Sequence, residues 1–208
     1  MLHRAARYLL AAIQVIIGWE WITSGTIKVL SGNFPQGLSN TLQQGISGNP
    51  NTWYVTFLQN IVQPNSVSVG YAIEWTEVTI GVVLISSAML LISRPRMRGE
   101  PQHRLVTGFF ALTAIVAVLS AILCINFHFW IGKGIIPGIG ADAVDEGIDL
   151  EALIPVFSLV ILIANLALIK LMRGETWYSR LYQHSLLGLR RFIGTEDAPQ
   201  HETAGGGQ

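Results

Sequence analysis

Four long apolar runs dominate the chain, at about residues 8–30, 67–92, 105–131 and 152–172. The last of them contains "LIPVFSLVILIANLALIKLM", in which only one residue carries a charge. A helix rises 1.5 Å per residue and the hydrocarbon core of a bilayer is about 30 Å thick, so each run can span it. The pattern predicts an all-α integral membrane protein, a four-transmembrane-helix bundle within residues 1–173.

Two segments outside these runs have helical patterns of their own. Residues 49–64, "NPNTWYVTFLQNIVQP", predict a short helix in the outer interface, with Asn49 as its cap and Pro50 in its first turn. Its apolar face would carry Trp53, Tyr54, Phe57, Leu58 and Ile61. Residues 175–192, "ETWYSRLYQHSLLGLRRF", predict an amphipathic helix on the cytoplasmic surface of an anionic bilayer. It begins a region, residues 174–208, whose end we expect to be disordered.

Positive charge lies almost wholly on one side of the predicted membrane. All Lys and Arg except Lys28 and Lys133 fall at the N-terminus, in the loop between the second and third spans, or after the fourth span: Arg4, Arg7, Arg94, Arg96, Arg98, Arg104, Lys170, Arg173, Arg180, Arg190 and Arg191. The positive-inside rule therefore predicts that both termini are cytoplasmic.

Composition removes several classes of function. Only 12% of the residues are charged, the 13 basic residues balance the 13 acidic ones, and no nucleic-acid partner is expected. The single cysteine, Cys124, excludes an intramolecular disulfide and a C-x-x-C motif. His128 is the only histidine within a span, E-x-x-H pairs are missing, and the acidic loop after the third span does not match a calcium loop. We expect no haem, flavin or metal cofactor.

Three carboxylates inside the predicted spans carry the functional argument. Glu20 lies about 18 Å from the cytoplasmic start of the first span, and Glu77 about 15 Å from the outer end of the second, so their depths match. Glu74 shares a helix face with Glu77, Gly70 and Gly81. An ionisable residue at this depth costs about 2.5–3.5 kcal/mol on insertion scales, so each needs a partner or a function.

These groups predict a polar pocket in the outer half of the bundle. On the first span, Glu20 would share the inner face with Ile13, Ile16, Ile17, Ser24 and Ile27. The pocket would hold Glu20, Glu74, Glu77, Lys28 and His128 beneath a roof of Trp19, Trp21, Trp75, Phe127, Phe129 and Trp130. Simpler interpretations remain open. In these interpretations, Lys28 extends outward to the membrane interface or pairs with a glutamate, and His128 is an interfacial residue. Ser158 and Asn165 would bridge helices.

Proton-linked chemistry in an apolar pocket fits a quinone. Its head group is flat and apolar, has two carbonyls that need hydrogen-bond donors, and takes up two protons on reduction. Protonated Glu20, Glu74 or Glu77, or else Lys28 or His128, would supply donors and protons. A small proton-coupled transporter would use the same residue types.

The motifs also resemble a known family. "IGWEWITSGTIKVLSGNFPQGL" is similar to the opening motif of the DoxX/DoxD family, with Gly18, Gly25 and Lys28 in its G-x-x-x-x-x-x-G-x-x-K pattern. "NPNTWYVTFLQNIVQP" and "GYAIEWTEVTIGVVLI" resemble the segments that follow, so the resemblance covers about residues 5–172. It implies a prokaryotic cytoplasmic-membrane protein. The DoxD branch includes the membrane subunit of thiosulfate:quinone oxidoreductase, which works with a small second subunit.

The combined prediction is a quinone-reactive membrane subunit that receives electrons from thiosulfate or another sulfur compound or thiol through a partner. Glu20 and Glu77 would bind and protonate the head group, Glu74 would relay protons, and Lys28 would hold an anionic substrate or balance charge. Trp19, Trp21, Trp75 and His128 would line the binding site. The alternatives are a non-catalytic organiser of redox proteins, docked through its C-terminal helix, and a small transporter.

Overall fold

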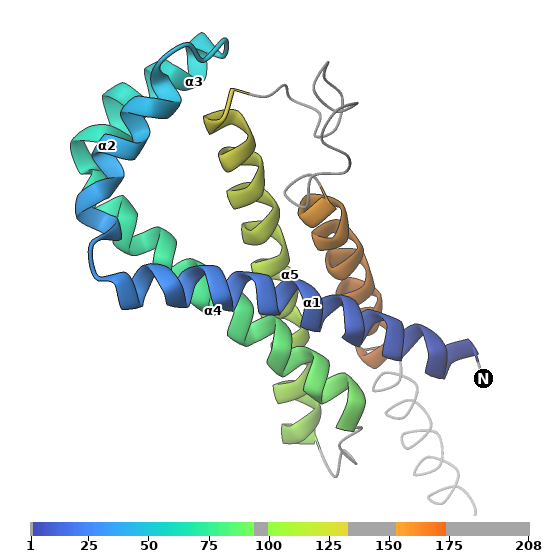
Figure 1. Ribbon diagram of the computed structural model, residues 1–208. Coiled ribbons are helices and arrows are strands. Elements are labelled where there is room, and N and C mark those ends of the chain that lie inside the picture. Colours follow the sequence, from blue (N-terminus) through green and yellow to red (C-terminus); the bar gives the residue numbers. More distant parts are fainter. Residues whose placement is uncertain (1, 94–99, 133–152, 174–208) are drawn as a thin grey trace, which may run out of the picture. The chain divides into compact units, whose positions relative to one another are not determined.

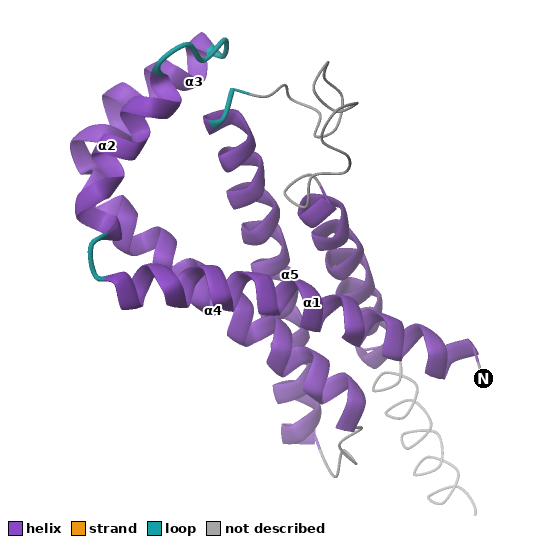
Figure 2. Ribbon diagram, viewed as in Figure 1, coloured by secondary structure: helices purple, strands orange, loops and turns teal. Residues whose placement is uncertain are grey.

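The computed structural model describes residues 2–93, 100–132 and 153–173. Their regular structure is helical throughout and includes no strand (Figure 2). The labelled helices in Figure 1 are α1 Leu2–Ser31, α2 Phe34–Ile46, α3 Thr52–Phe57, α4 Ser66–Ser93 and α5 Glu100–Trp130. An unlabelled helix, here called the last span, covers Leu153–Arg173.

Four helical stretches are long and apolar enough to cross a membrane: Ala5–Ser31, Thr52–Ser93, Pro101–Trp130 and Leu153–Arg173. The prediction of an all-α chain with four such helices is confirmed. The chain divides into two compact units, Met1–Ile169 and Lys170–Gln208, each considered by itself. The predicted C-terminal helix and tail, and the acidic loop after the third span, lie outside the described residues.

Glycines set the contact between α1 and α4. A Cβ atom added at Gly81 of α4 would lie 2.6 Å from the backbone nitrogen of Ile22 and 2.7 Å from the carbonyl oxygen of Gly18. One added at Gly25 would lie 2.7 Å from the backbone nitrogen of Val78. The two backbones thus touch at positions where only glycine fits, as small residues allow between membrane helices. The two helices are antiparallel, since Gly18 meets Ile85 and Gly25 meets Val78.

This contact determines which face of α1 is buried, and the predicted face is only partly correct. Ile16 and Ile27 are exposed, as is Glu20. The buried side instead carries Leu10, Ala11, Gln14, Ile17, Gly18, Trp21 and Gly25. The prediction followed the apolar residues of α1. In a membrane, however, lipid accepts apolar side chains as readily as the protein interior does, so close backbone approach decides the face.

On α4 the predicted face is confirmed. Gly70, Glu74, Glu77 and Gly81 are all buried. Gly70 packs on α2, where an added Cβ would lie 2.5 Å from the Cα atom of Pro35.

The helical path from Thr52 to Ser93 is interrupted at Pro64. A π-helical turn, Leu58–Val62, follows α3, and a 3-10 turn, Gln63–Asn65, leads into α4. Proline has no N–H to donate to the carbonyl four residues earlier, so a regular α-helix cannot pass through this point. Helix begins at Thr52 rather than Pro50, and Asn49 is not its cap, since the N-cap position is Asn51.

A hydrophobic cluster joins α2 to the α3 segment. Its buried members are Leu38, Leu42, Tyr54, Leu58 and Val62, and Phe129 and Trp130 of α5 pack against it. The Tyr54 hydroxyl donates a hydrogen bond of 3.0 Å to the carbonyl oxygen of Asn126. The predicted apolar face of this segment is split, because Trp53 and Ile61 are more than half exposed. Tyr54, Leu58 and Val62, spaced four residues apart, form the packed stripe.

A chain of buried hydrogen bonds connects three spans. The Trp21 indole N–H donates to the Ser120 hydroxyl oxygen at 2.7 Å, and the hydroxyls of Ser120 and Ser158 are 2.9 Å apart. α1, α5 and the last span are therefore fixed together at this level. Ser158 bridges helices, which was one of the two interpretations left open by the sequence.

We predict that Gly81→Ala destabilises the protein by about 1–3 kcal/mol, the usual cost of overpacking. The added methyl would press on backbone atoms of Ile22 and Gly18, which cannot move aside without separating the helices. Thermal unfolding in mild detergent, followed by the fraction that still elutes as a monodisperse peak, measures the loss.

Gly108→Ala is the matched control, since it lies within α5 and an added Cβ meets no atom within 4 Å. It should change stability by less than about 1 kcal/mol, the difference in helix propensity. Equal midpoints for both variants would contradict the proposed packing of α1 on α4.

Candidate functional site

A pocket of about 230 Å³ opens between α1, the C-terminal turns of α5 and the first turn of the last span. Polar groups of α1 line one side, and aromatic and aliphatic groups line the other. Its lining residues are Glu20, Trp21, Ser24, Lys28, Cys124, Phe127, Trp130, Ile131 and Ile154. The pocket therefore combines an ammonium, a carboxyl and a hydroxyl with apolar walls.

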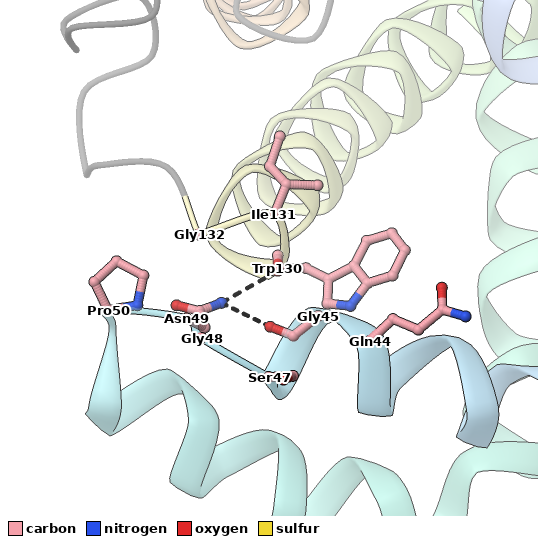
Figure 3. A pocket seen from close by; sticks show the side chains of 9 residues that line it. All are labelled: Gln44, Gly45, Ser47, Gly48, Asn49, Pro50, Trp130, Ile131 and Gly132. Carbon is pink, nitrogen blue, oxygen red and sulfur yellow. Dashed lines mark hydrogen bonds between the residues drawn. The ribbon is translucent and has the colours of Figure 1, made fainter.

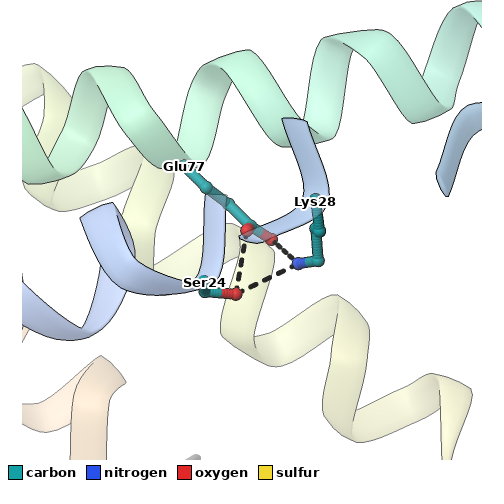
Figure 4. Close-up of polar contacts among 3 residues, drawn as sticks. All are labelled: Ser24, Lys28 and Glu77. Atoms are coloured by element: carbon teal, nitrogen blue, oxygen red, sulfur yellow. Dashed lines mark hydrogen bonds and ion pairs between the residues drawn. The ribbon is translucent and has the colours of Figure 1, made fainter. Parts of the chain in front are cut away.

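An ion pair holds the polar side together (Figure 4). The Lys28 ammonium of α1 donates to the Glu77 carboxylate of α4 and lies 3.2 Å from the Ser24 hydroxyl oxygen. Ser24 in turn donates to the other carboxylate oxygen of Glu77 at 3.0 Å. The triangle closes because Ser24 and Lys28 lie one helical turn apart and Gly25 brings the backbone of α4 against α1.

The two charges of the pair differ in access. Glu77 is fully buried, whereas the Lys28 side chain is 21% exposed and contributes to the pocket surface. The ammonium also lies 5.2 Å from the centroid of the Phe34 ring and 5.4 Å from that of Phe127, within range of a cation–π interaction. Glu77 neutralises and orients a cation whose remaining N–H can meet a bound molecule. Of the alternatives for Lys28, pairing with a glutamate is confirmed.

Glu20 does not occupy the predicted buried position. It borders the pocket, but its side chain is exposed, and among the described residues no ion pair joins it to Lys28 or Glu77. The predicted equal depth of Glu20 and Glu77 is wrong, because the residue of α1 that packs against Glu77 is Gly25, five residues beyond Glu20. The depth estimate also could not reveal that Glu20 points away from α4, because the glycine contact fixes the rotation of α1.

The predicted aromatic roof is only partly present. Trp21, Phe127 and Trp130 line the pocket, whereas Phe129 packs in the α2 cluster. Trp19 and Trp75 are 66% and 56% exposed and lie outside the pocket lining. These two tryptophans are on the sides of α1 and α4 that lie away from the contact between the helices, so the structure does not bring them to the pocket.

Glu74 lies one helical turn before Glu77 on α4, and His128 is next in sequence to the pocket residue Phe127 on α5. Both side chains are buried, but neither lines the pocket. Glu74 is 3% exposed, and its Oε2 atom has no hydrogen-bond partner among the described residues. His128 is 4% exposed, and its Nδ1 atom likewise has none there. No group of three or more His, Cys, Asp or Glu within the described ranges could hold a metal ion.

A second, larger pocket of about 480 Å³ lies between the end of α2 and the end of α5 (Figure 3). Asn49 anchors the loop here, since its amide nitrogen is 2.9 Å from the Phe129 carbonyl oxygen and 3.1 Å from those of Gly45 and Trp130. None of the described residues that line this pocket has an ionisable side chain. Trp130 and Ile131 border both pockets and form the wall that they share.

Sequence reasoning missed the role of one member of the site and one buried polar residue elsewhere on α1. Ser24 was assigned to the correct region but given no role, although its spacing of four residues from Lys28 is a recognisable hydrogen-bonding spacing. Gln14, which is completely buried, was passed over entirely. An uncharged amide in an apolar helix gives a weaker sequence signal than a carboxylate.

We predict that Lys28→Met destabilises the protein by about 3–5 kcal/mol, because it leaves the buried Glu77 carboxylate without its counter-charge. The double variant Lys28→Met/Glu77→Leu should regain most of that loss, since no unpaired charge remains. A double-mutant cycle measured by thermal unfolding in detergent gives the coupling.

Glu20→Gln is the control, because it removes the charge of an exposed carboxyl. Its free energy of unfolding should stay within about 0.5 kcal/mol of the wild-type value. Additive losses from the two single substitutions would mean that Lys28 and Glu77 are not coupled.

Comparisons of the chain with protein-family models, curated proteins and solved structures found no match. The resemblance to the DoxX/DoxD family therefore stays a prediction from the quoted motifs, and the functional argument rests on the site.

Proposed function

We propose that this chain is the quinone-binding membrane subunit of an oxidoreductase, with the head group in the pocket beside Lys28. The observation that carries the proposal is a neutralised ammonium, beside a carboxyl and a hydroxyl of the same helix, on one wall of a pocket whose other walls are apolar and aromatic. That helix is long and apolar enough to cross a membrane. Sites for small organic molecules have this composition, with mostly apolar walls and a few convergent polar groups.

One donor in the pocket suits a quinone carbonyl. The Lys28 ammonium gives two of its three N–H bonds to Glu77 and Ser24, which leaves one for a carbonyl oxygen. The Trp130 indole nitrogen packs against Gly45 of α2, a residue of the larger pocket, so Trp130 contributes ring surface here rather than a hydrogen bond. Phe127, Ile131 and Ile154 supply apolar contact for the ring.

The roles of the carboxyl groups differ from those inferred from sequence. Glu77 holds the ammonium in place and is a positioning residue. Glu20, at the exposed edge of the pocket, is the group suited to deliver a proton to a reduced head group. A relay role for Glu74 is kept as part of the proposal, because its buried Oε2 atom lacks a partner in the described part of the chain.

Reduction of the quinone to the quinol requires two electrons and two protons. We assign the electrons to a sulfur donor, either two thiosulfate ions or two thiols, whose sulfur atoms become joined by a new S–S bond. Thiosulfate brings no protons, so both must come through the protein or from water. The donor would act through a second subunit, as the family resemblance implies. The proposed location is a prokaryotic cytoplasmic membrane, with both termini in the cytoplasm.

We predict that protein purified in mild detergent carries near-stoichiometric quinone and that Lys28→Met loses it. A hydrogen bond from a charged donor contributes about 1.5–3 kcal/mol, which corresponds to roughly a tenfold to hundredfold loss in affinity. Chromatography and mass spectrometry of organic extracts, normalised to co-purified lipid, measure the bound quinone. Glu20→Gln should keep quinone bound but slow its reduction.

Trp75→Phe is the control, because Trp75 is an exposed aromatic residue outside the pocket. It should retain the wild-type quinone content. Quinone at the lipid background in the wild type would overturn the proposal. Flux of a small solute into proteoliposomes would then favour the transporter, and recovery of redox partners without quinone would favour the organiser.

A further inference from the structure

Polar residues recur along the buried side of α1 at intervals of seven. Arg7, Gln14, Trp21 and Lys28 follow one another two helical turns apart. Gln14 is 0% and Trp21 4% exposed, while Arg7 and Lys28 are intermediate. The series covers about 31 Å of helix, close to the thickness of the hydrocarbon core. Its last member is the ammonium of the pocket.

The neighbouring spans repeat this spacing. Thr113 lies seven residues before Ser120 on α5, and Asn165 lies seven after Ser158 on the last span; both are 0% exposed. Successive spans alternate in direction. Gln14, Thr113 and Asn165 are therefore each displaced two turns from the Trp21–Ser120–Ser158 hydrogen bonds, toward the end of the bundle where α1 begins. We call these three residues, with Ser87, the inner polar layer.

Ser87 belongs to this layer through the register of α1 on α4. A Cβ atom at Gly18 would lie 2.9 Å from the Ile85 side chain and 3.1 Å from the Leu84 Cβ atom. In an antiparallel pair the preceding turn of α1, at Gln14, then comes level with the following turn of α4, which contains Ser87. The Ser87 side chain is 0% exposed.

The inner polar layer is incompletely hydrogen-bonded. Both Nε2 and Oε1 of Gln14, Oγ of Ser87 and Oδ1 of Asn165 are buried without a partner among the described residues. The Nε atom of Arg7, two turns nearer the start of α1, is in the same state. Polar atoms this deeply buried are normally satisfied by protein or by ordered water.

The mixture of open groups identifies the ligand as water. An anion would need donors only and a cation would need oxygen atoms only, whereas this layer presents an amide N–H₂, two amide oxygens and a hydroxyl. Water both donates and accepts. The Trp21–Ser120–Ser158 hydrogen bonds lie between this layer and the pocket, because Ser158 follows the pocket residue Ile154 by one turn and Trp21 lines the pocket itself.

We propose that the inner polar layer is a hydrated path, open toward the N-terminal end of α1, that supplies protons to the pocket beside Lys28. Water at Gln14, Ser87 and Asn165 connects to the Ser120 and Ser158 hydroxyls, which can donate and accept, whereas the Trp21 indole can only donate. This inference rests on the proposed quinone reduction. It provides the two protons that each quinone takes up when thiosulfate, which carries none, supplies the electrons.

Cysteine labelling tests the hydration and its direction. A thiol reacts as the thiolate, which forms in water and not in lipid. We expect Gln14→Cys and Asn165→Cys, in membrane vesicles, to react with a membrane-impermeant methanethiosulfonate cation at least tenfold faster than their neighbours Val15→Cys and Leu166→Cys. Those neighbours have the same depth but are 41% and 51% exposed on the outer side of their helices. Wild-type protein gives the baseline from Cys124.

Labelling should occur only when the reagent is added on the side of the membrane that labels Ala5→Cys, near the start of α1. Rates equal to those of the neighbours would show a dry interior and overturn the path. Labelling only from the side that labels Ser31→Cys would overturn its direction. If one of the two cysteine variants fails to fold, the other carries the measurement.

The quinone content of the same preparations is assayed separately, so the two proposals can fail independently. Bound quinone with an unlabelled layer overturns the path alone; a labelled layer without quinone overturns the quinone site alone. We further expect Gln14→Leu to bind quinone normally but to lower several-fold the rate at which dithionite, which supplies electrons without protons, reduces it. An unchanged rate would overturn the supply of protons through this layer.

Discussion

The close contact of two helix backbones at Gly18, Gly25 and Gly81 is the constraint on which the rest of the structure depends. It leaves no room for a side chain between α1 and α4, and so it fixes both their separation and their rotation. With that rotation, Lys28 faces Glu77, Trp21 reaches Ser120 and Glu20 turns outward.

The ion pair is possible at this depth because each member compensates the other. A carboxylate completely removed from solvent needs more than one donor, and Glu77 receives the ammonium of Lys28 and the hydroxyl of Ser24. The exposed part of Lys28 then creates a positive potential in the pocket, although the Lys28–Glu77 pair as a whole has little net charge. This arrangement favours a ligand with carbonyl oxygens over one with a full negative charge.

The sequence was sufficient for the coarse architecture and insufficient for the site. The four apolar runs matched the four long helices because length and hydropathy are properties of each segment alone. The buried face of α4 was also correct, since its glycines were used as markers of close contact. On α1 the apolar residues were used instead, which misplaced Glu20, Trp19 and the isoleucines. The helix α2 was not predicted, although Pro35 at its first turn and the buried Leu38 and Leu42 at helical spacing mark it.

The seven-residue spacing on α1 has a geometric consequence. A straight α-helix has 3.6 residues per turn. The side-chain direction around the helix axis therefore changes by about 20° for each interval of seven residues, and by about 60° from Arg7 to Lys28. One polar series can therefore face different neighbours in turn, which agrees with Trp21 meeting α5 and Lys28 meeting α4. The number of residues between these polar positions therefore matters more to the site than the identity of the apolar residues that face the lipid. Insertion or deletion of one residue between Gln14 and Lys28 would rotate everything beyond it by about 100° and separate the ammonium from its carboxylate.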